Sequence, residues 1–167
     1  EAINILKKGG NAIDAAIAAS AVQAVVNPSA TGVGGDCFAI VSINGKDPVS
    51  VNGSGIAPKK AKLEYYKTNK INNIGLTSPH SVTIPGSVHA WCSMHEKFGN
   101  IELEEVLLGA INFARNGFPI HEVEALAWKE NENKLKANEN SKNLFLKNNK
   151  SYGYGEIFKN YQLANTL

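Results

Sequence analysis

A glycine-rich loop is the first feature of the sequence that could bind a ligand. Residues 31–36 read Thr-Gly-Val-Gly-Gly-Asp, and consecutive backbone N–H groups in such a loop can hold an anion. A phosphate-binding loop, however, runs from a strand into a helix and ends in Lys-Ser or Lys-Thr. Here the expected order is helix, loop, strand. The sequence therefore favours a tightly packed turn over a nucleotide site.

The histidines do not have the spacing of a metal site. They are His80, His89, His95 and His121. His95 precedes a glutamate but lacks the second histidine of a His-Glu-x-x-His zinc motif, and His89 lies on a different face of the same expected helix. We expect neither a metal nor a cofactor in this chain.

Three residues are candidate nucleophiles by type. Ser54 lies in a Gly-Ser-Gly stretch that is too short for the Gly-x-Ser-x-Gly elbow of hydrolases. Cys37 begins an apolar run and Cys92 follows a tryptophan, so we expect buried free thiols, with a disulfide or a nucleophile as the alternatives. A triad assembled in space stays open, because its members need not be neighbours in sequence.

The bulk composition is that of an ordinary globular protein. Among its 167 residues, 43% are hydrophobic and 19% are charged, and the net charge is +2. The basic residues are scattered and include a single arginine, Arg115, so no nucleic-acid groove is expected. No apolar stretch reaches the roughly 20 residues of a membrane span. The first residues form a helical pattern without a signal peptide.

Periodicity predicts the elements that must position any site. Gly9-Gly10 separates two helices, and Asn11 can cap the second, which is apolar nearly all round and so expected to be buried against a sheet. Asn44-Gly45 predicts a turn between two strands. The expected helices are 1–8, 12–26, 88–98 and 103–114, the expected strands are 37–43, 49–52 and 81–84, and the polar region 121–150 has a helical pattern. We predict an α/β (α+β) fold without an internal linker.

A series of short motifs then resembles the γ-glutamyltranspeptidase family. The run ILKKGGNAIDAA at residues 5–16 is similar to the opening signature of that family. The similarity continues in collinear order over the whole chain. The further motifs are VNP at 26–28, GVGG at 32–35, AP at 57–58, IPGSV at 84–88, FG at 98–99, ARNGF at 114–118 and LANTL at 163–167.

This resemblance implies a self-processing precursor with a four-layer αββα N-terminal-nucleophile fold. The precursor cuts itself into a large and a small chain, and the new N-terminal threonine of the small chain attacks the substrate amide with its own α-amine as base. Residues 1–167 would be the N-terminal portion of a large chain, an incomplete domain. No threonine here matches the nucleophile, which the resemblance places downstream with the oxyanion hole. The threonines are Thr31, Thr68, Thr77, Thr83 and Thr166.

The same resemblance implies no catalytic residue in this chain and two kinds of partner. The first is the small catalytic chain of the same precursor, which would form a heterodimer with a large, apolar interface. The second is a small amide substrate. Taken alone, the fragment should expose strand edges and apolar faces and aggregate. Periplasmic or exported and cytoplasmic locations both stay open.

One departure from the family pattern bears on the substrate. True γ-glutamyl enzymes carry Arg-Glu-x-Ala-Pro after the second strand, and the arginine grips the α-carboxylate of the substrate. Here Ser54 and Gly55 take the two charged positions, so we expect them to be the substrate-binding residues. Loss of a bidentate charged pair costs roughly 2–4 kcal/mol, or a factor of about 30 to 1000 in affinity.

We therefore expect a hydrolase of small amides other than γ-glutamyl compounds. One alternative is a true γ-glutamyl hydrolase or transferase acting on glutathione-like substrates, in which Lys46, Lys59 or Lys60 replaces the arginine. Another is a family member without catalysis that acts as a binding or assembly protein.

Overall fold

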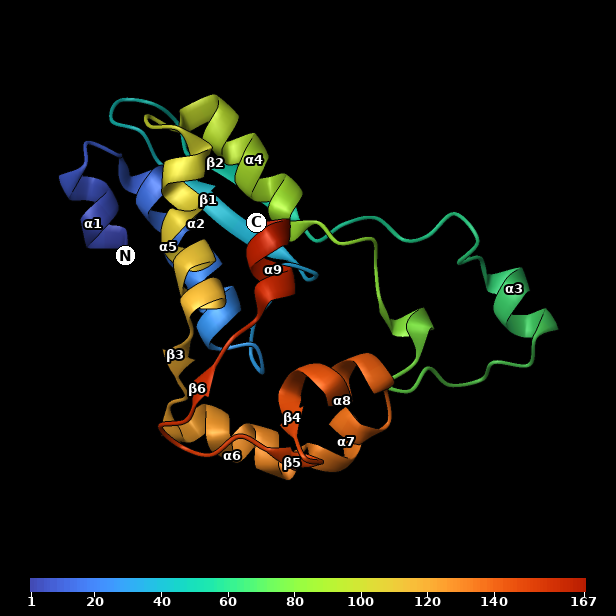
Figure 1. Cartoon of the computed structure of the whole chain (residues 1–167). Coiled ribbons are helices and arrows are strands. Elements are labelled where there is room, and N and C mark those ends of the chain that lie inside the picture. Colours follow the sequence, from blue (N-terminus) through green and yellow to red (C-terminus); the bar gives the residue numbers. More distant parts are fainter. The chain divides into compact units, whose positions relative to one another are not determined.

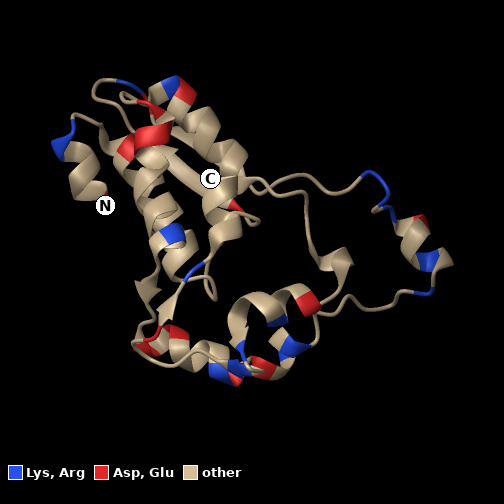
Figure 2. Ribbon diagram, viewed as in Figure 1, with Lys and Arg blue, Asp and Glu red and all other residues tan.

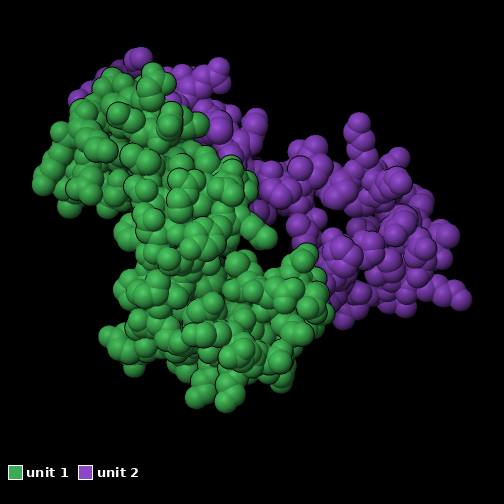
Figure 3. Space-filling model, viewed as in Figure 1, with its two compact units in different colours: residues 1–32, 99–167 green, residues 33–98 purple.

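The computed structural model describes residues 1–167 and contains helices and short antiparallel sheets (Figure 1). It forms two compact units, one of residues 1–32 and 99–167 and the other of residues 33–98 (Figure 3). Unit 1 is thus discontinuous, because the residues of unit 2 are inserted between its two segments in the sequence. No helix combines the length and the apolar character needed to cross a bilayer. The prediction of a mixed α/β chain is confirmed.

The upper half of unit 1 in Figure 1 is built around helix α2. This helix contacts α1 and α5, and α5 in turn contacts α9. Alanines on the buried faces of α2 and α5 allow the helices to approach closely, because small side chains leave room for the neighbouring backbone. The bounds are α1 Ala2–Lys7, α2 Ala12–Val26, α5 Leu103–Asn116 and α9 Tyr161–Thr166.

The start of α2 follows the sequence prediction. The Asn11 Oδ1 atom accepts hydrogen bonds from the backbone N–H groups of Ile13 (2.8 Å) and Asp14 (3.2 Å). The Asp14 carboxylate accepts one from the N–H of Asn11 at 2.8 Å, which completes a capping box. The helix ends before Pro28, as expected for a residue that precedes proline.

The other half of unit 1 combines short helices and strand pairs around an aromatic cluster. Trp128 and Phe158 are at its centre, with ring centroids 4.9 Å apart. The helices expected between residues 121 and 150 are confirmed, whereas the short strand pairs were not predicted. The elements are α6 Glu122–Glu130, α7 Glu132–Lys136 and α8 Glu139–Phe145, with β3 Phe118–Pro119 antiparallel to β6 Ile157–Phe158 and β4 Leu146–Lys147 antiparallel to β5 Lys150–Ser151.

Unit 2 contains the predicted hairpin, covered by one helix. Strands β1 (Cys37–Val41) and β2 (Val49–Gly53) pair antiparallel, from Cys37 opposite Gly53 to Val41 opposite Val49. Helix α4 (Ser87–Phe98) contacts both strands. Between β2 and α4 the chain makes a long excursion that contains α3 (Leu63–Thr68) and the 3-10 helix η1 (Pro79–Ser81) (Figure 1).

The strand predicted at residues 81–84 is wrong. Ser81 ends η1, and residues 82–86 have no regular secondary structure and join no sheet. Pro79 favours the first turn of a helix, and the Ser78 hydroxyl caps it by accepting from the N–H of His80 at 3.2 Å. The apolar alternation that suggested a strand is therefore present without a partner strand to pair with.

Candidate functional site

The candidate substrate-binding residues follow strand β2 directly and are held by a segment about 30 residues further along the chain. The backbone N–H of Ser54 donates to the Asn52 Oδ1 atom at 3.1 Å. The Ser54 carbonyl accepts a hydrogen bond from the Thr83 hydroxyl at 3.0 Å. One step later, the N–H of Ile84 donates to the carbonyl of Ile56 at 3.0 Å. The turn after β2 is thus joined to residues 83–84 on both sides of Gly55.

The glycine loop is part of the same arrangement. The carbonyl of Gly35 accepts from the backbone N–H groups of Gly86 (3.2 Å) and Ser87 (3.0 Å), at the start of α4. The Ser87 hydroxyl donates to the carbonyl of Val33 at 3.3 Å. The loop therefore presents carbonyl oxygens to the N-terminus of the helix, which occupies N–H groups that could otherwise hold an anion. The predicted turn is present, but it is not closely packed: Gly34 and Gly35 are exposed, and a Cβ atom on Gly32 or Gly34 would meet nothing within 4 Å.

Ser54 has a hydroxyl that is only weakly engaged. Its Oγ atom lies 3.4 Å from the carbonyl of Gly55, a long hydrogen bond, and the residue is half-buried. Such a hydroxyl can donate to or accept from a small polar group. Neither Ser54 nor Gly55 carries a charge, so these two positions can recognise a carboxylate only through neutral hydrogen bonds.

The lysines proposed as substitutes for the family arginine do not lie equally near Ser54. Lys46 is in the turn of the hairpin, and Ser54 follows the opposite end of β2. Four residues of strand separate these ends by about 13 Å, so the register argues against Lys46. Lys59 and Lys60 are exposed in the excursion that leads to α3, a segment where Figure 2 shows several basic residues.

The two cysteines are free, but they are not both buried as expected. Cys92 is exposed on α4 and Cys37 is half-buried at the start of β1. Burial raises the pKa of the Cys37 thiol, and the hydrogen bond with Trp91 lowers it less. A raised pKa keeps the thiol protonated and weakly nucleophilic at neutral pH. The expectation of two buried thiols is therefore met only in part at Cys37 and is wrong for Cys92.

Two fully buried carboxylates hold unit 1 together, and sequence reasoning missed both long-range contacts. Asp14 accepts hydrogen bonds from the backbone N–H of Asn100 at 3.0 and 3.2 Å. Glu124 accepts from the N–H (2.9 Å) and hydroxyl (2.6 Å) of Ser29 and from Trp128 Nε1 (2.6 Å). Buried charges persist only where such donors compensate the lost hydration. The spacing of Glu124 and Trp128 by four residues was the only local signal.

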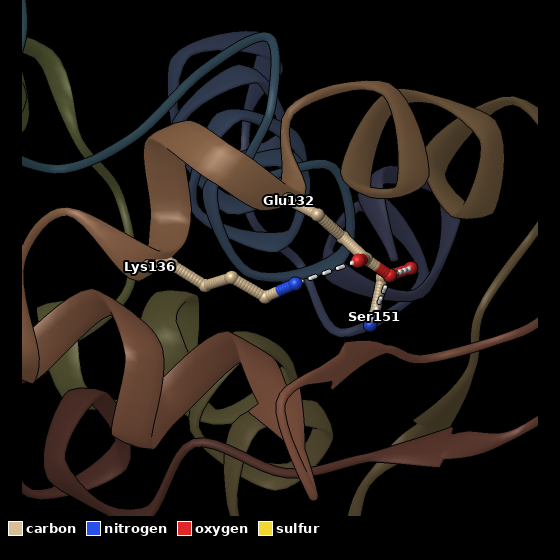
Figure 4. A network of polar contacts seen from close by, with 3 residues as sticks. All are labelled: Glu132, Lys136 and Ser151. Carbon is tan, nitrogen blue, oxygen red and sulfur yellow. Dashed lines mark hydrogen bonds and ion pairs between the residues drawn. The ribbon is translucent and has the colours of Figure 1, made fainter.

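A third acidic network lies at the surface of unit 1. Glu132 accepts from the N–H (2.9 Å) and hydroxyl (3.0 Å) of Ser151 and pairs with Lys136 at 3.1 Å (Figure 4). The bond from the Ser151 N–H is the main cause that lowers the pKa of Glu132 to about 2, and Lys136 and the Ser151 hydroxyl contribute. This carboxylate ties α7 to β5. No three His, Cys, Asp or Glu side chains are grouped to hold a metal ion.

Comparison with known proteins identifies relatives of this chain along almost its full length. The Gamma-glutamyltranspeptidase family profile matches residues 2–167. The "Glutathione hydrolase-like YwrD proenzyme" of Bacillus subtilis is 36% identical over 165 residues, which is 98% of this chain and 31% of that protein. The "Oxamate amidohydrolase proenzyme" of Klebsiella pneumoniae is 31% identical over 172 residues, 99% of this chain and 32% of that protein.

The solved structures agree with the sequence matches. The cephalosporin acylase of Bacillus halodurans superposes with a TM-score of 0.92 at 32% identity, over 99% of this chain and 32% of that chain. The present chain thus spans about a third of the length of the relatives it matches. With the profile match over nearly every residue, the chain belongs to the γ-glutamyltranspeptidase family of N-terminal-nucleophile hydrolases.

Proposed function

We propose that this chain is the first part of the large chain of a self-processing amidohydrolase that cleaves a small amide other than a γ-glutamyl compound. The nucleophile is the N-terminal threonine of a small chain encoded downstream in the same precursor. The relatives described as proenzymes support this proposal, since that description implies a maturation step. This chain supplies part of the wall around the substrate and none of the groups that break bonds.

The observation that carries the proposal is the neutral pair Ser54-Gly55 at the end of β2. A γ-glutamyl group brings an α-carboxylate, whose burial is favourable only if a cation or several strong donors receive it. Ser54 offers one hydroxyl, and Gly55 offers no side chain. An acyl group without a carboxylate loses no binding free energy when it packs against these two neutral residues. The names of the oxamate amidohydrolase and the cephalosporin acylase agree with a scaffold that accepts several acyl groups.

The second proposal concerns the partner that covers the hairpin. The outward side chains of β1 include Phe38, which is 67% exposed, and Ile40, which is 79% exposed. Large apolar side chains next to each other on a sheet face are typical of a surface buried in an assembly. Because the relatives are about three times as long as this chain, we assign this face to a later part of the same precursor, the small chain included.

The decisive experiment uses the full-length precursor and two matched substrates. Intact mass first establishes whether it yields two fragments, the smaller beginning with threonine. The processed enzyme is then assayed on butyryl-p-nitroanilide and γ-glutamyl-p-nitroanilide, which share an acyl chain but differ in the charged α-carbon groups. Oxamate, whose carboxylate is attached directly to the amide carbon, is added to test a small acyl group that is charged. We expect kcat/KM for the uncharged butyryl substrate to exceed that for the γ-glutamyl substrate.

Each other outcome favours a specific rival. Efficient release of glutamate from γ-glutamyl-p-nitroanilide would contradict the proposal and make Lys59 and Lys60 the candidates for the carboxylate contact. Replacing each of them with methionine would then raise KM for that substrate. A single uncut chain, without a threonine at the expected junction, would favour a binding or assembly protein.

A further inference from the structure

The turn that carries Ser54 is packed backbone against backbone. Gly55 has a φ of +73°, in the left-handed region that L-residues with side chains rarely adopt. A Cβ atom on Gly55 would overlap the carbonyl oxygen of Ile84 and would lie 2.9 Å from its carbonyl carbon. The obstacle is main chain, so no neighbouring side chain can rotate away to make room.

Two further glycines near this contact also have no room for a Cβ atom. A Cβ on Gly53 would lie 2.5 Å from the Cβ of Ala90 and 2.8 Å from the carbonyl of Cys37. A Cβ on Gly86 would lie 2.5 Å from the N atom of Gly55 and closer still to the carbonyl of Gly53. Three glycines that are separated by up to 33 positions therefore meet at one place, which we term the glycine contact (Gly53, Gly55 and Gly86).

We propose that the glycine contact leaves no room for any side chain at position 55. The backbone path of the turn that carries Ser54 then determines the acyl-group specificity. This inference rests on the proposed function of the Ser54 site. It adds that the missing glutamate is excluded by the course of the main chain. The Arg-Glu pair of γ-glutamyl enzymes therefore cannot be restored here by replacing residues 54 and 55.

Two hydrogen bonds hold the turn in this path. The Thr83 hydroxyl donates to the carbonyl of Ser54 at 3.0 Å, and the N–H of Ile84 donates to the carbonyl of Ile56 at 3.0 Å. They flank Gly55 and pull both sides of the turn onto residues 83–84. Thr83 is exposed, so its hydroxyl can be removed without opening a cavity in the core. In this arrangement Thr83 is a positioning residue that acts through Ser54.

The test compares variants of the full-length processed enzyme. Gly55→Ala should lower the melting temperature and raise KM for butyryl-p-nitroanilide or oxamate. Gly75→Ala is the matched control, because a Cβ on Gly75 meets nothing within 4 Å and its φ is not left-handed. Thr83→Val, which is nearly isosteric, should raise KM by about threefold to tenfold with kcat little changed, the effect of one lost hydrogen bond.

The double variant Ser54→Arg with Gly55→Glu tests directly whether position 55 can accommodate a side chain. We expect it to melt at a lower temperature than the wild type and to gain no activity on γ-glutamyl-p-nitroanilide. A double variant that keeps the wild-type melting temperature and gains γ-glutamyl hydrolysis would overturn the proposal. A Gly55→Ala variant with the same melting temperature, kcat and KM as Gly75→Ala would also overturn the proposal.

The remaining outcomes separate this inference from the proposed function. If Gly55→Ala fails to fold or mature, the Thr83→Val variant provides the test. A lower melting temperature with an unchanged KM would mean that Thr83 only stabilises the fold, and it would overturn the proposal that Thr83 positions Ser54 for substrate binding. If the wild type itself cleaves γ-glutamyl-p-nitroanilide efficiently, the proposed function fails. The closure of position 55 is then still judged by the melting temperatures of Gly55→Ala and Gly75→Ala.

Discussion

The carboxylate of Asp14 accepts a hydrogen bond from the backbone N–H of Asn100, 86 positions later in the chain, at 3.0 Å. The Asn100 side chain donates to the carbonyl of Gly9 at 2.8 Å, so the same two segments are joined twice. One acidic side chain thus caps α2 and fixes the residues that lead into α5.

Replacing Asp14 with alanine should therefore destabilise unit 1. The change leaves the backbone N–H groups of Asn11 and Asn100 without their acceptor and removes a fully buried side chain, which costs about 2–4 kcal/mol in the free energy of unfolding. The midpoint of urea unfolding of the full-length protein measures it. Asp47→Asn is the control, since Asp47 is exposed in the hairpin turn. Equal midpoints for Asp14→Ala and Asp47→Asn would contradict the assigned role.

Glu124 provides a second test of a buried carboxylate. Glu124→Gln keeps the size of the side chain but directs an NH₂ group toward a site where three donors already converge, from Ser29 and Trp128. We expect a loss of about 1–3 kcal/mol, seen as a lower urea midpoint. The matched change Glu130→Gln alters an exposed acid at the end of the same helix, and it should leave the midpoint nearly unchanged.

The surface network of Glu132 predicts a dependence of stability on pH. Its pKa is lowered from 4.5 to about 2 in the folded protein, so the unfolded chain binds the proton more tightly. The stabilisation is therefore complete above about pH 4.5 and is lost as the pH falls toward 2. Glu132→Gln should weaken the dependence of the melting temperature on pH over this range. Glu139→Gln, on the next helix, should leave that dependence as in the wild type. A slope unchanged in Glu132→Gln would refute the assignment.

The exposed face of β1 predicts the behaviour of residues 1–167 expressed alone. Phe38 and Ile40 should drive self-association, because both present large apolar surface next to an open strand edge. Light scattering after size exclusion should detect oligomers, and the pair Phe38→Thr with Ile40→Thr should reduce them, since threonine is polar but retains a high β-strand propensity. Leu76→Ser, which removes a 91% exposed residue from a loop, is the control. A monodisperse wild-type monomer would contradict this prediction.

Local patterns in the sequence predicted local structure well. Asn11 and Asp14 are three residues apart, and that spacing was enough to place the start of α2. Asn44-Gly45 likewise placed the hairpin turn. At residues 81–84 the same kind of pattern failed, since apolar alternation predicts a strand only if a partner is available. The two-unit division was also invisible, because no change of composition marks residues 32–33 or 98–99.

The candidate site was predictable only in part. The resemblance to a family pointed to Ser54 and Gly55, and the structure places them at the end of β2. Their contacts with Thr83 and Ile84 could not be read from the sequence, because each joins residues about 30 positions apart. The left-handed conformation of Gly55 could not be predicted from the sequence either. Many glycines are possible turn residues, and only the folded backbone shows which one has no room for a side chain.

The discontinuity of unit 1 has a consequence for how the protein is made. Asp14 leaves the ribosome long before its partner Asn100, and synthesis at roughly 5 to 20 residues per second separates them by about 4 to 17 seconds. Unit 2, whose residues are contiguous, is complete before the second part of unit 1 exists. Through that interval the nascent chain carries an Asp14 carboxylate that lacks its Asn100 contact and an alanine-rich helix α2 that α5 does not yet cover, so the apolar surface of α2 stays exposed during translation.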